Sequence, residues 1–195
     1  MKRELKILLA SAGFSTFVYS MLGPIYAIFV EEIGGGVLEA SYAISIFTFV
    51  SGVLIYLLTR WEDKVKHQEK LLILGYFLSS IGFFSYILVT KPFHIYIIEV
   101  IFGLAVAVLS PVYDGLYSKN LDKGKFISEW GDWESMAYIV SSLSALSGGI
   151  LAKYFGFRFL FFVMFLLSLI PVFVSLALLK QEKKNVNLSN LRKRL

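Results

Sequence analysis

The feature that most constrains this chain is the alternation of long apolar runs with short charged segments. The runs cover residues 7–30, 40–59, 71–90, 92–113, 135–152 and 159–179. Glu99 is the one Asp, Glu, Lys or Arg inside any of them. A helix of about 20 residues, rising about 1.5 Å per residue, crosses a hydrocarbon core of about 30 Å. The pattern predicts an all-α polytopic membrane protein with six transmembrane helices.

Composition agrees with a lipid bilayer as the partner. Hydrophobic residues make up 57% of the chain and charged residues 17%, and mean hydropathy is +0.71. Soluble domains have roughly half apolar and about a quarter charged residues. The net charge of +5 does not indicate a nucleic-acid partner, because the basic residues lie between and after apolar runs rather than interleaved with aromatic side chains.

The chain offers few groups for covalent or metal chemistry. It has no cysteine, which excludes disulfides and thiolate ligands, and His67 and His94 lack the i, i+4 spacing of a helical zinc motif. The glycines at 34–36 lack the lysine of a nucleotide-binding loop, and no catalytic Ser, His or paired-carboxylate pattern is present. We therefore expect no metal, no cofactor and no enzymatic activity.

The distribution of Lys and Arg predicts an orientation. If the helices alternate, the N-terminus, residues 60–70, residues 113–134 and the tail share one side of the membrane, and that side carries 16 of the 19 basic residues. Basic residues concentrate on the cytoplasmic side. Both termini are therefore expected in the cytoplasm of a cell-membrane protein. All three tryptophans, Trp61, Trp130 and Trp133, fall at that boundary, where indole rings anchor.

Two short segments indicate an internal repeat. Residues 22–26 (LGPIY) and 109–113 (LSPVY) are 87 residues apart, which is three helices, and residues 51–54 (SGVL) weakly match 147–150 (SGGI). Three helices per unit invert the second copy, as in secondary transporters. We expect one domain over residues 1–195, with repeats at 1–90 and 91–179 and a basic tail at 180–195. Chance recurrence of Pro and Tyr in aromatic-rich helices is the alternative.

The chain resembles one six-helix half of a major facilitator superfamily transporter over nearly its whole length. The loop after the second run stands where that superfamily carries a glycine, three residues and then Asp-Arg-x-Gly-Arg-Arg. Asp63 and Lys64 match the acid and its basic neighbour, whereas Thr59, Lys66 and residues 67–68 depart from the glycines and the basic pair.

Two further segments carry the resemblance. Residues 122–125, from Asp122 to Lys125, are similar to the charged cluster after the fourth helix, and residues 148–149 with 155–158 are similar to the connection between the fifth and sixth helices. The family usually has two such halves in one chain. The resemblance therefore implies a homodimer, in which Asp63 of one subunit meets the first turn of the fifth helix in the other.

A row of small residues at Ser141, Ala145 and Gly149 has the spacing that lets membrane helices approach closely. This row could serve the subunit contact or pack within one subunit. The sequence leaves both alternatives open.

Glu99 is the principal candidate for binding a small-molecule or ion substrate, because an ionisable side chain inside a membrane usually faces a cavity or a partner. Family members often have an arginine here, four residues before a glycine that matches Gly103. A structural hydrogen bond to a nearby Tyr or Ser is the alternative role. Tyr26 and Tyr113, at equivalent places in the repeats, and Asp114 and Glu134, near the boundary, are further candidates.

These observations favour a secondary transporter of a small solute that works by alternating access. The charge of Glu99 and the aromatic walls suggest an organic cation or an amphipathic solute. The rival hypothesis is a membrane scaffold or accessory subunit that retains the fold without transport. The basic tail, with residues 192–194, is expected to contact anionic lipid.

Overall fold

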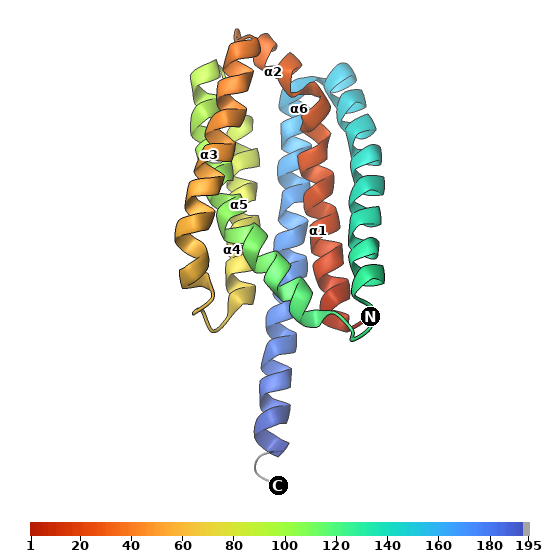
Figure 1. Ribbon diagram of the computed structural model, residues 1–195. Coiled ribbons are helices and arrows are strands. Elements are labelled where there is room, and N and C mark those ends of the chain that lie inside the picture. Colours follow the sequence, from red (N-terminus) through yellow and green to blue (C-terminus); the bar gives the residue numbers. More distant parts are fainter. Residues whose placement is uncertain (193–195) are drawn as a thin grey trace.

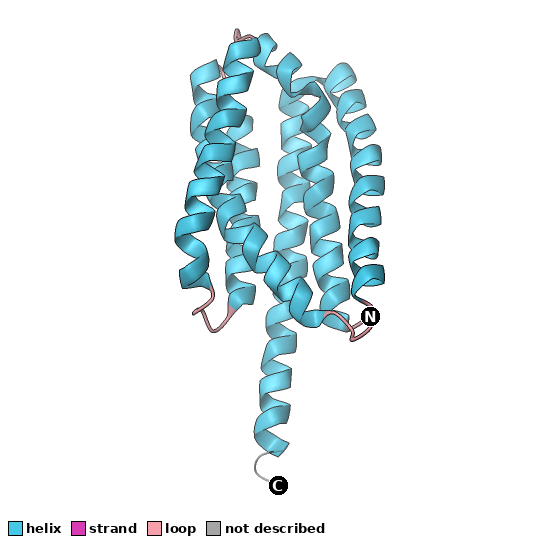
Figure 2. Cartoon of the chain, viewed as in Figure 1, coloured by secondary structure: helices cyan, strands magenta, loops and turns pink. Residues whose placement is uncertain are grey.

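The computed structural model describes residues 1–192, with side chains described to Lys180. The end of the tail, including Lys193 and Arg194, lies outside the described residues. Over the described range the protein consists of helices and turns (Figures 1 and 2), which confirms the predicted all-α class. The elements are α1 (Arg3–Leu22), η1 (Gly23–Ile25), α2 (Tyr26–Glu32), α3 (Val37–Glu62), α4 (Gln68–Tyr86), α5 (Pro92–Asn120) and α6 (Phe126–Arg192).

Four stretches of the described chain are long and apolar enough to cross a membrane: Arg3–Glu32, Val37–Glu62, Pro92–Asn120 and Phe126–Lys180. The last has 55 residues and is bent at Gly156, whose φ of 80° places it in the left-handed region that favours glycine. The shorter α4 opens with Gln, Glu and Lys, which lowers its mean hydropathy. The count of six spanning helices stays a prediction. It requires that α4 crosses the membrane and that the two parts of α6, before and after Gly156, each cross it once.

The two repeated prolines have different effects on the backbone. Pro24 lies in the 3-10 turn η1, which separates α1 from α2. Pro111 lies inside α5, which continues past it to Asn120. Proline removes a helical N–H and crowds the preceding turn. A proline can therefore interrupt a helix, as at Pro24, or be accommodated within one, as at Pro111. The two copies of the motif therefore differ: the helix is interrupted at residues 22–26 and continues through 109–113.

The helix after the charged loop begins earlier than the apolar run suggests. Its first residue is Phe126, nine positions before Ser135. The added turns pack against the bundle. The ring centroids of Trp130 and Tyr117 are 4.8 Å apart. The Oε2 atom of buried Glu129 accepts a hydrogen bond from the backbone amide of Asp122 at 2.8 Å. Aromatic and polar contacts thus extend the helix beyond its apolar part.

The helices form two groups that meet along the length of the bundle (Figure 1). In one group α1 packs on α6, and in the other α3 and α4 pack on α5, while α4 also packs on α6. The N-terminus and the connections at 63–67 and 121–125 lie at one end, which we call the basic end. The connections at 33–36 and 87–91 and the bend at Gly156 lie at the opposite end.

Contact between α1 and α6 is very close. A methyl group placed on Gly148 would lie 2.0 Å from the carbonyl oxygen of Met21, so only glycine fits at this crossing. Nearby, the Ser20 and Ser141 hydroxyls are 2.9 Å apart, and Ser144 donates to the carbonyl of Phe17. Ser141 therefore packs within the chain, whereas nothing lies within 4 Å of a methyl group placed on Gly149.

The outer surface of the bundle is apolar, and α3 is its least buried long helix. Only 11% of the most apolar stretch of α3 is buried, compared with 50% for α5. Large apolar side chains are also exposed on the first part of α6, among them Tyr138, Leu143 and Leu146. Such surfaces suit lipid or another membrane-embedded protein. They agree with the multi-pass membrane protein predicted from the sequence.

Candidate functional site

Glu99 is buried in α5, at 7% exposure, and accepts two hydrogen bonds from tyrosines of other helices. Tyr26 and Tyr86 each donate a hydroxyl to its Oε1 atom at 2.8 Å. Tyr26 is the first residue of α2, directly after the 3-10 turn at Pro24, and Tyr86 is the last residue of α4. The break in the first helix therefore places Tyr26 where it reaches the carboxylate.

These groups border a cavity of about 260 Å³ at the opposite end from the basic end. Its lining is mainly aromatic and comes from α1, η1, α2, α3, α4 and α5. The lining residues are Tyr19, Leu22, Gly23, Tyr26, Ile44, Phe47, Phe83, Tyr86, Glu99 and Phe102. Most small-molecule sites share this character, with apolar walls and a few placed polar groups.

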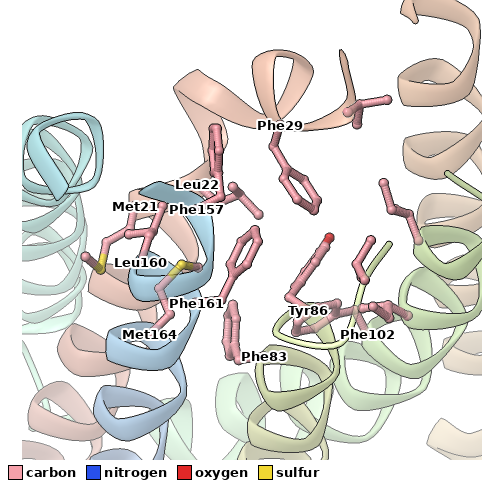
Figure 3. Close-up of a cluster of buried hydrophobic side chains, with 14 of the residues drawn as sticks. Met21, Leu22, Phe29, Phe83, Tyr86, Phe102, Phe157, Leu160, Phe161 and Met164 are labelled. Atoms are coloured by element: carbon pink, nitrogen blue, oxygen red, sulfur yellow. The ribbon is translucent and has the colours of Figure 1, made fainter. Parts of the chain in front are cut away.

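Packing holds the aromatic walls in place. Tyr19 makes edge contacts with Phe83 and Phe102, whose rings are themselves 4.9 Å apart, and its hydroxyl donates to Ser79 at 2.9 Å. Tyr86 stacks on Phe161 at 4.9 Å (Figure 3). These rings belong to the larger of the two buried apolar clusters. The cavity walls are therefore fixed by the core itself.

The carboxylate of Glu99 has hydrogen-bond donors on one oxygen and no cationic partner among the described residues. Within the described residues, no Lys, Arg or His forms an ion pair with it, and the ion pairs found there lie at the basic end. Oε1 receives both tyrosine hydroxyls, whereas no described residue donates a hydrogen bond to Oε2. A charged residue near a membrane centre costs about 2.5 to 3.5 kcal/mol on insertion scales. Such a group can bind a cation or carry a proton.

The sequence candidates separate into two places. Glu99 and Tyr26 come together, while Tyr113 lies in the second buried cluster, stacked on Tyr117 at 5.8 Å. The Tyr113 hydroxyl is buried and has no hydrogen-bond partner among the described residues. Asp114 and Glu134 are exposed and do not contact Glu99. The repeat-equivalent tyrosines thus have different surroundings.

The loop candidates lie at the basic end. Asp63, Lys64 and Lys125 are exposed. Asp122 pairs with the Met1 amine at 3.2 Å and with Lys2 at 3.9 Å. The hydrogen bond from the Met1 ammonium, opposed by partial desolvation, holds the pKa of Asp122 below its ordinary value. Asp122 therefore ties the 121–125 connection to the N-terminus.

Sequence reasoning missed Tyr86 and Glu62. Tyr86 is 13 residues before Glu99 on a different helix, and no spacing rule brings two helices to that register. Glu62 was passed over because it stands in a dense charged loop beside Asp63, where hydrated side chains are the rule. It is instead 3% exposed.

The family model described as Major Facilitator Superfamily matches residues 8–194. A protein of Bacillus subtilis (strain 168), named as the uncharacterized MFS-type transporter YitZ, is 26% identical over 151 residues, which cover 75% of this chain and 88% of YitZ.

The fold also matches a solved structure. The POT family transporter PepTSo superposes with a TM-score of 0.66 at 16% sequence identity. The match covers 91% of this chain and 37% of the PepTSo chain. At that level of identity the similarity concerns the fold alone, and this chain spans well under half of the solved transporter.

Proposed function

The chain belongs to the major facilitator superfamily, and on that ground we propose that it is a secondary transporter of a small organic cation that works as a homodimer by alternating access. The observation that carries this proposal is the aromatic cavity around Glu99. The carboxylate there has two neutral donors on one oxygen and no protein cation beside it within the described residues.

A cation with an apolar body fits this chemistry best. The positive group would be attracted by the Oε2 atom of Glu99, and aromatic faces add about 0.5 to 2 kcal/mol for a cation close to a ring. The hydrocarbon part would contact Phe47, Phe83 and Phe102, which line the same cavity. A neutral sugar or an anion would leave the carboxylate without a partner, which opposes binding.

The homodimer is proposed because one six-helix unit supplies one wall of a transport path, and a closed pair of identical units supplies two. Exposed apolar side chains on α3 and on the first part of α6 offer membrane-embedded contact surfaces. The match to this chain covers 88% of YitZ, so YitZ and this chain have similar lengths. The two inverted repeats, 1–90 and 91–179, are proposed as the internal units of each wall.

The subunit contact is proposed to involve the loop at 63–67. A surface hollow of about 420 Å³ lies at the first turns of α6, lined by Phe126, Ile127, Trp130, Gly131 and Glu134. An acidic side chain is favoured near free amides at a helix N-terminus. Asp63 of the partner subunit would approach this turn, and Lys64 of the partner subunit would approach Glu134. The basic end is proposed to face the cytoplasm of a cell-membrane protein.

Uptake into proteoliposomes tests the proposal. Labelled tetraethylammonium is the probe, and we expect Glu99→Gln to lower its uptake by at least about tenfold, the factor that corresponds to 1.4 kcal/mol. Asp114→Asn, which removes an exposed carboxylate from the same helix, is the matched control and should retain uptake.

Three results would contradict parts of the proposal. Uptake by Glu99→Gln equal to that of the unsubstituted protein would remove this residue from the transport path. Absence of uptake for tetraethylammonium and for a panel of larger organic cations, from a correctly inserted protein, would favour the non-transporting scaffold. A mass of one subunit at high concentration in mild detergent would contradict the homodimer.

A further inference from the structure

A second glutamate, Glu62, is buried at the basic end. It is the last residue of α3 and is 3% exposed. Neither Oε1 nor Oε2 has a hydrogen-bond partner among the described residues. Burying an ionised carboxylate without partners costs several kcal/mol. Glu62 therefore has an electrostatic need that the described part of the protein leaves unmet.

Glu62 lines a separate cavity of about 180 Å³ between the end of α3, the start of α4 and the second half of α5. The lining residues are Thr59, Glu62, Asp63, Gln68, Pro111, Val112, Gly115 and Lys119. None of them borders the cavity around Glu99. A volume of this size holds an ion together with water molecules, since one water occupies about 30 Å³.

The nearest basic side chain on the cavity wall is engaged elsewhere. Lys119 donates to the Oε1 atom of Gln68 at 2.7 Å, and no ion pair joins it to Glu62 in the described residues. Gln68 in turn donates from Nε2 to the backbone carbonyl of Glu62 at 3.3 Å. These contacts hold Lys119 on the amide of Gln68, so the Glu62 carboxylate has no protein cation as a partner within the described residues.

The donor atoms indicate the class of that cation. Glu62 and Thr59 both line the cavity and carry its candidate oxygen donors: the carboxylate, and a hydroxyl that already donates its hydrogen to the Ile55 carbonyl at 2.7 Å and so keeps its lone pairs. Oxygen donors select hard cations such as Na⁺, Mg²⁺ and Ca²⁺. Calcium sites generally use several carboxylates, whereas this cavity has one buried carboxylate and a lysine on its wall.

We propose that the cavity between α3 and α5 binds a small monovalent cation, for which Na⁺ is the probe, through the carboxylate of Glu62 with the hydroxyl of Thr59 as a second donor. The proposal concerns a site separate from Glu99 and does not depend on transport. Binding neutralises a buried carboxylate that has no hydrogen-bond donor among the described residues.

Thermal unfolding of the full chain in detergent tests the site. NaCl is titrated against N-methylglucamine chloride at constant ionic strength, so that general screening is the same throughout. A ligand that binds only the folded state raises Tm, and we expect a rise of about 2 to 4 °C, the shift typical of a modest stabilisation at this chain length.

Matched variants assign the effect to one carboxylate. Glu62→Gln should abolish the sodium-dependent rise, and without sodium its Tm should equal or exceed that of the unsubstituted protein, because an unpartnered charge has been removed. Asp114→Asn, which removes an exposed carboxylate of α5 that does not line the cavity, and Glu99→Gln, the other buried glutamate, should both retain the rise. Gly115→Ala adds a methyl group at a position with open space around it and checks that a small change in the lining preserves the fold.

Several results would overturn the proposal. These are no sodium-dependent rise in the unsubstituted protein, an equal rise in Glu62→Gln, or loss of the rise in Asp114→Asn. Stabilisation by Mg²⁺ at concentrations well below those of Na⁺, dependent on Glu62, would contradict the monovalent assignment. Failure of tetraethylammonium uptake would leave the sodium effect unchanged, since the two experiments depend on different glutamates.

Discussion

Glu99 and Glu62 are two buried glutamates at opposite ends of one helical bundle, and their surroundings differ in two respects. Glu99 receives two tyrosine hydroxyls on one oxygen, whereas neither oxygen of Glu62 receives a donor from the described residues. Around Glu99 the walls are aromatic, while around Glu62 they include a threonine, a glutamine and a lysine. Similar burial thus supports two different ligand chemistries, a large apolar cation and a small hydrated one.

The tyrosine donors make the largest difference between the two sites. Replacing both Tyr26 and Tyr86 by Phe leaves Glu99 without protein donors, which converts its surroundings to those of Glu62. Each hydrogen bond to a charged group contributes about 1.5 to 3 kcal/mol, so we expect the double variant to lose about 3 to 6 kcal/mol in free energy of unfolding.

Denaturant unfolding in detergent measures this loss. Tyr113→Phe is the matched control, because its buried hydroxyl has no partner in the described structure, and it should change stability by less than about 0.5 kcal/mol. A double variant as stable as Tyr113→Phe would show that the two hydroxyls do not support Glu99.

The contact between α1 and α6 should matter to one site and not to the other. Gly148→Ala forces α1 away from α6, because the added methyl group would lie 2.0 Å from the Met21 carbonyl oxygen. Overpacking costs about 1 to 3 kcal/mol. Met21 is five residues before Tyr26, so the shift should also weaken tetraethylammonium binding.

The sodium effect at Glu62 should persist in Gly148→Ala, because its cavity is built from α3, α4 and α5 with the 63–67 connection. Gly149→Ala, with open space at that position, serves as the control and should leave both sites unchanged. Equal damage to both sites by Gly148→Ala would indicate that the two ends of the bundle are not independent.

Asp122 extends the comparison to a carboxylate in contact with solvent, and here we expect the smallest effect. Its pKa is lowered, chiefly by the hydrogen bond from the Met1 ammonium. A depressed pKa in the folded state means that the pairing stabilises the protein above the unfolded-state pKa and is lost as pH falls through the folded-state pKa.

Asp122→Asn should therefore lower Tm slightly at pH 7, and the difference should shrink in about 0.5 M salt, where exposed ion pairs are screened. It should also shrink below the ordinary pKa of an aspartate. A decrease in Tm that is larger at acidic pH than at neutral pH would contradict this account of Asp122.

The apolar runs predicted the all-helical class and most helix positions, because bilayer thickness and charge placement restrict such a chain severely. The sequence also named Glu99 and Tyr26 as candidates, and the structure joins them by a hydrogen bond. Tyr86 could not be found this way, since its contact with Glu99 depends on how α4 and α5 pack. Glu62 could not be found because burial at a helix end depends on the Gln68 and Lys119 side chains that approach it from other helices.

The two copies of the repeated motif have different structures. Pro24 breaks the first helix and places Tyr26 at Glu99, whereas α5 passes Pro111 unbroken and Tyr113 packs among aromatic rings. The early start of α6 was missed because Glu129 looked like a loop residue, although it is buried against Asp122. The contact between Tyr26 and Glu99 joins segments 73 residues apart, whereas the contact between Asp122 and Glu129 spans only seven residues.

Calorimetric titration of tetraethylammonium into the purified protein tests the central claim most directly, because it measures binding at Glu99 without requiring transport. We predict saturable binding whose affinity falls at least about tenfold in Glu99→Gln, a change of 1.4 kcal/mol or more, and is unchanged in Glu62→Gln. Equal affinity in Glu99→Gln and the unsubstituted protein, or a loss confined to Glu62→Gln, would contradict the assignment of the organic-cation site.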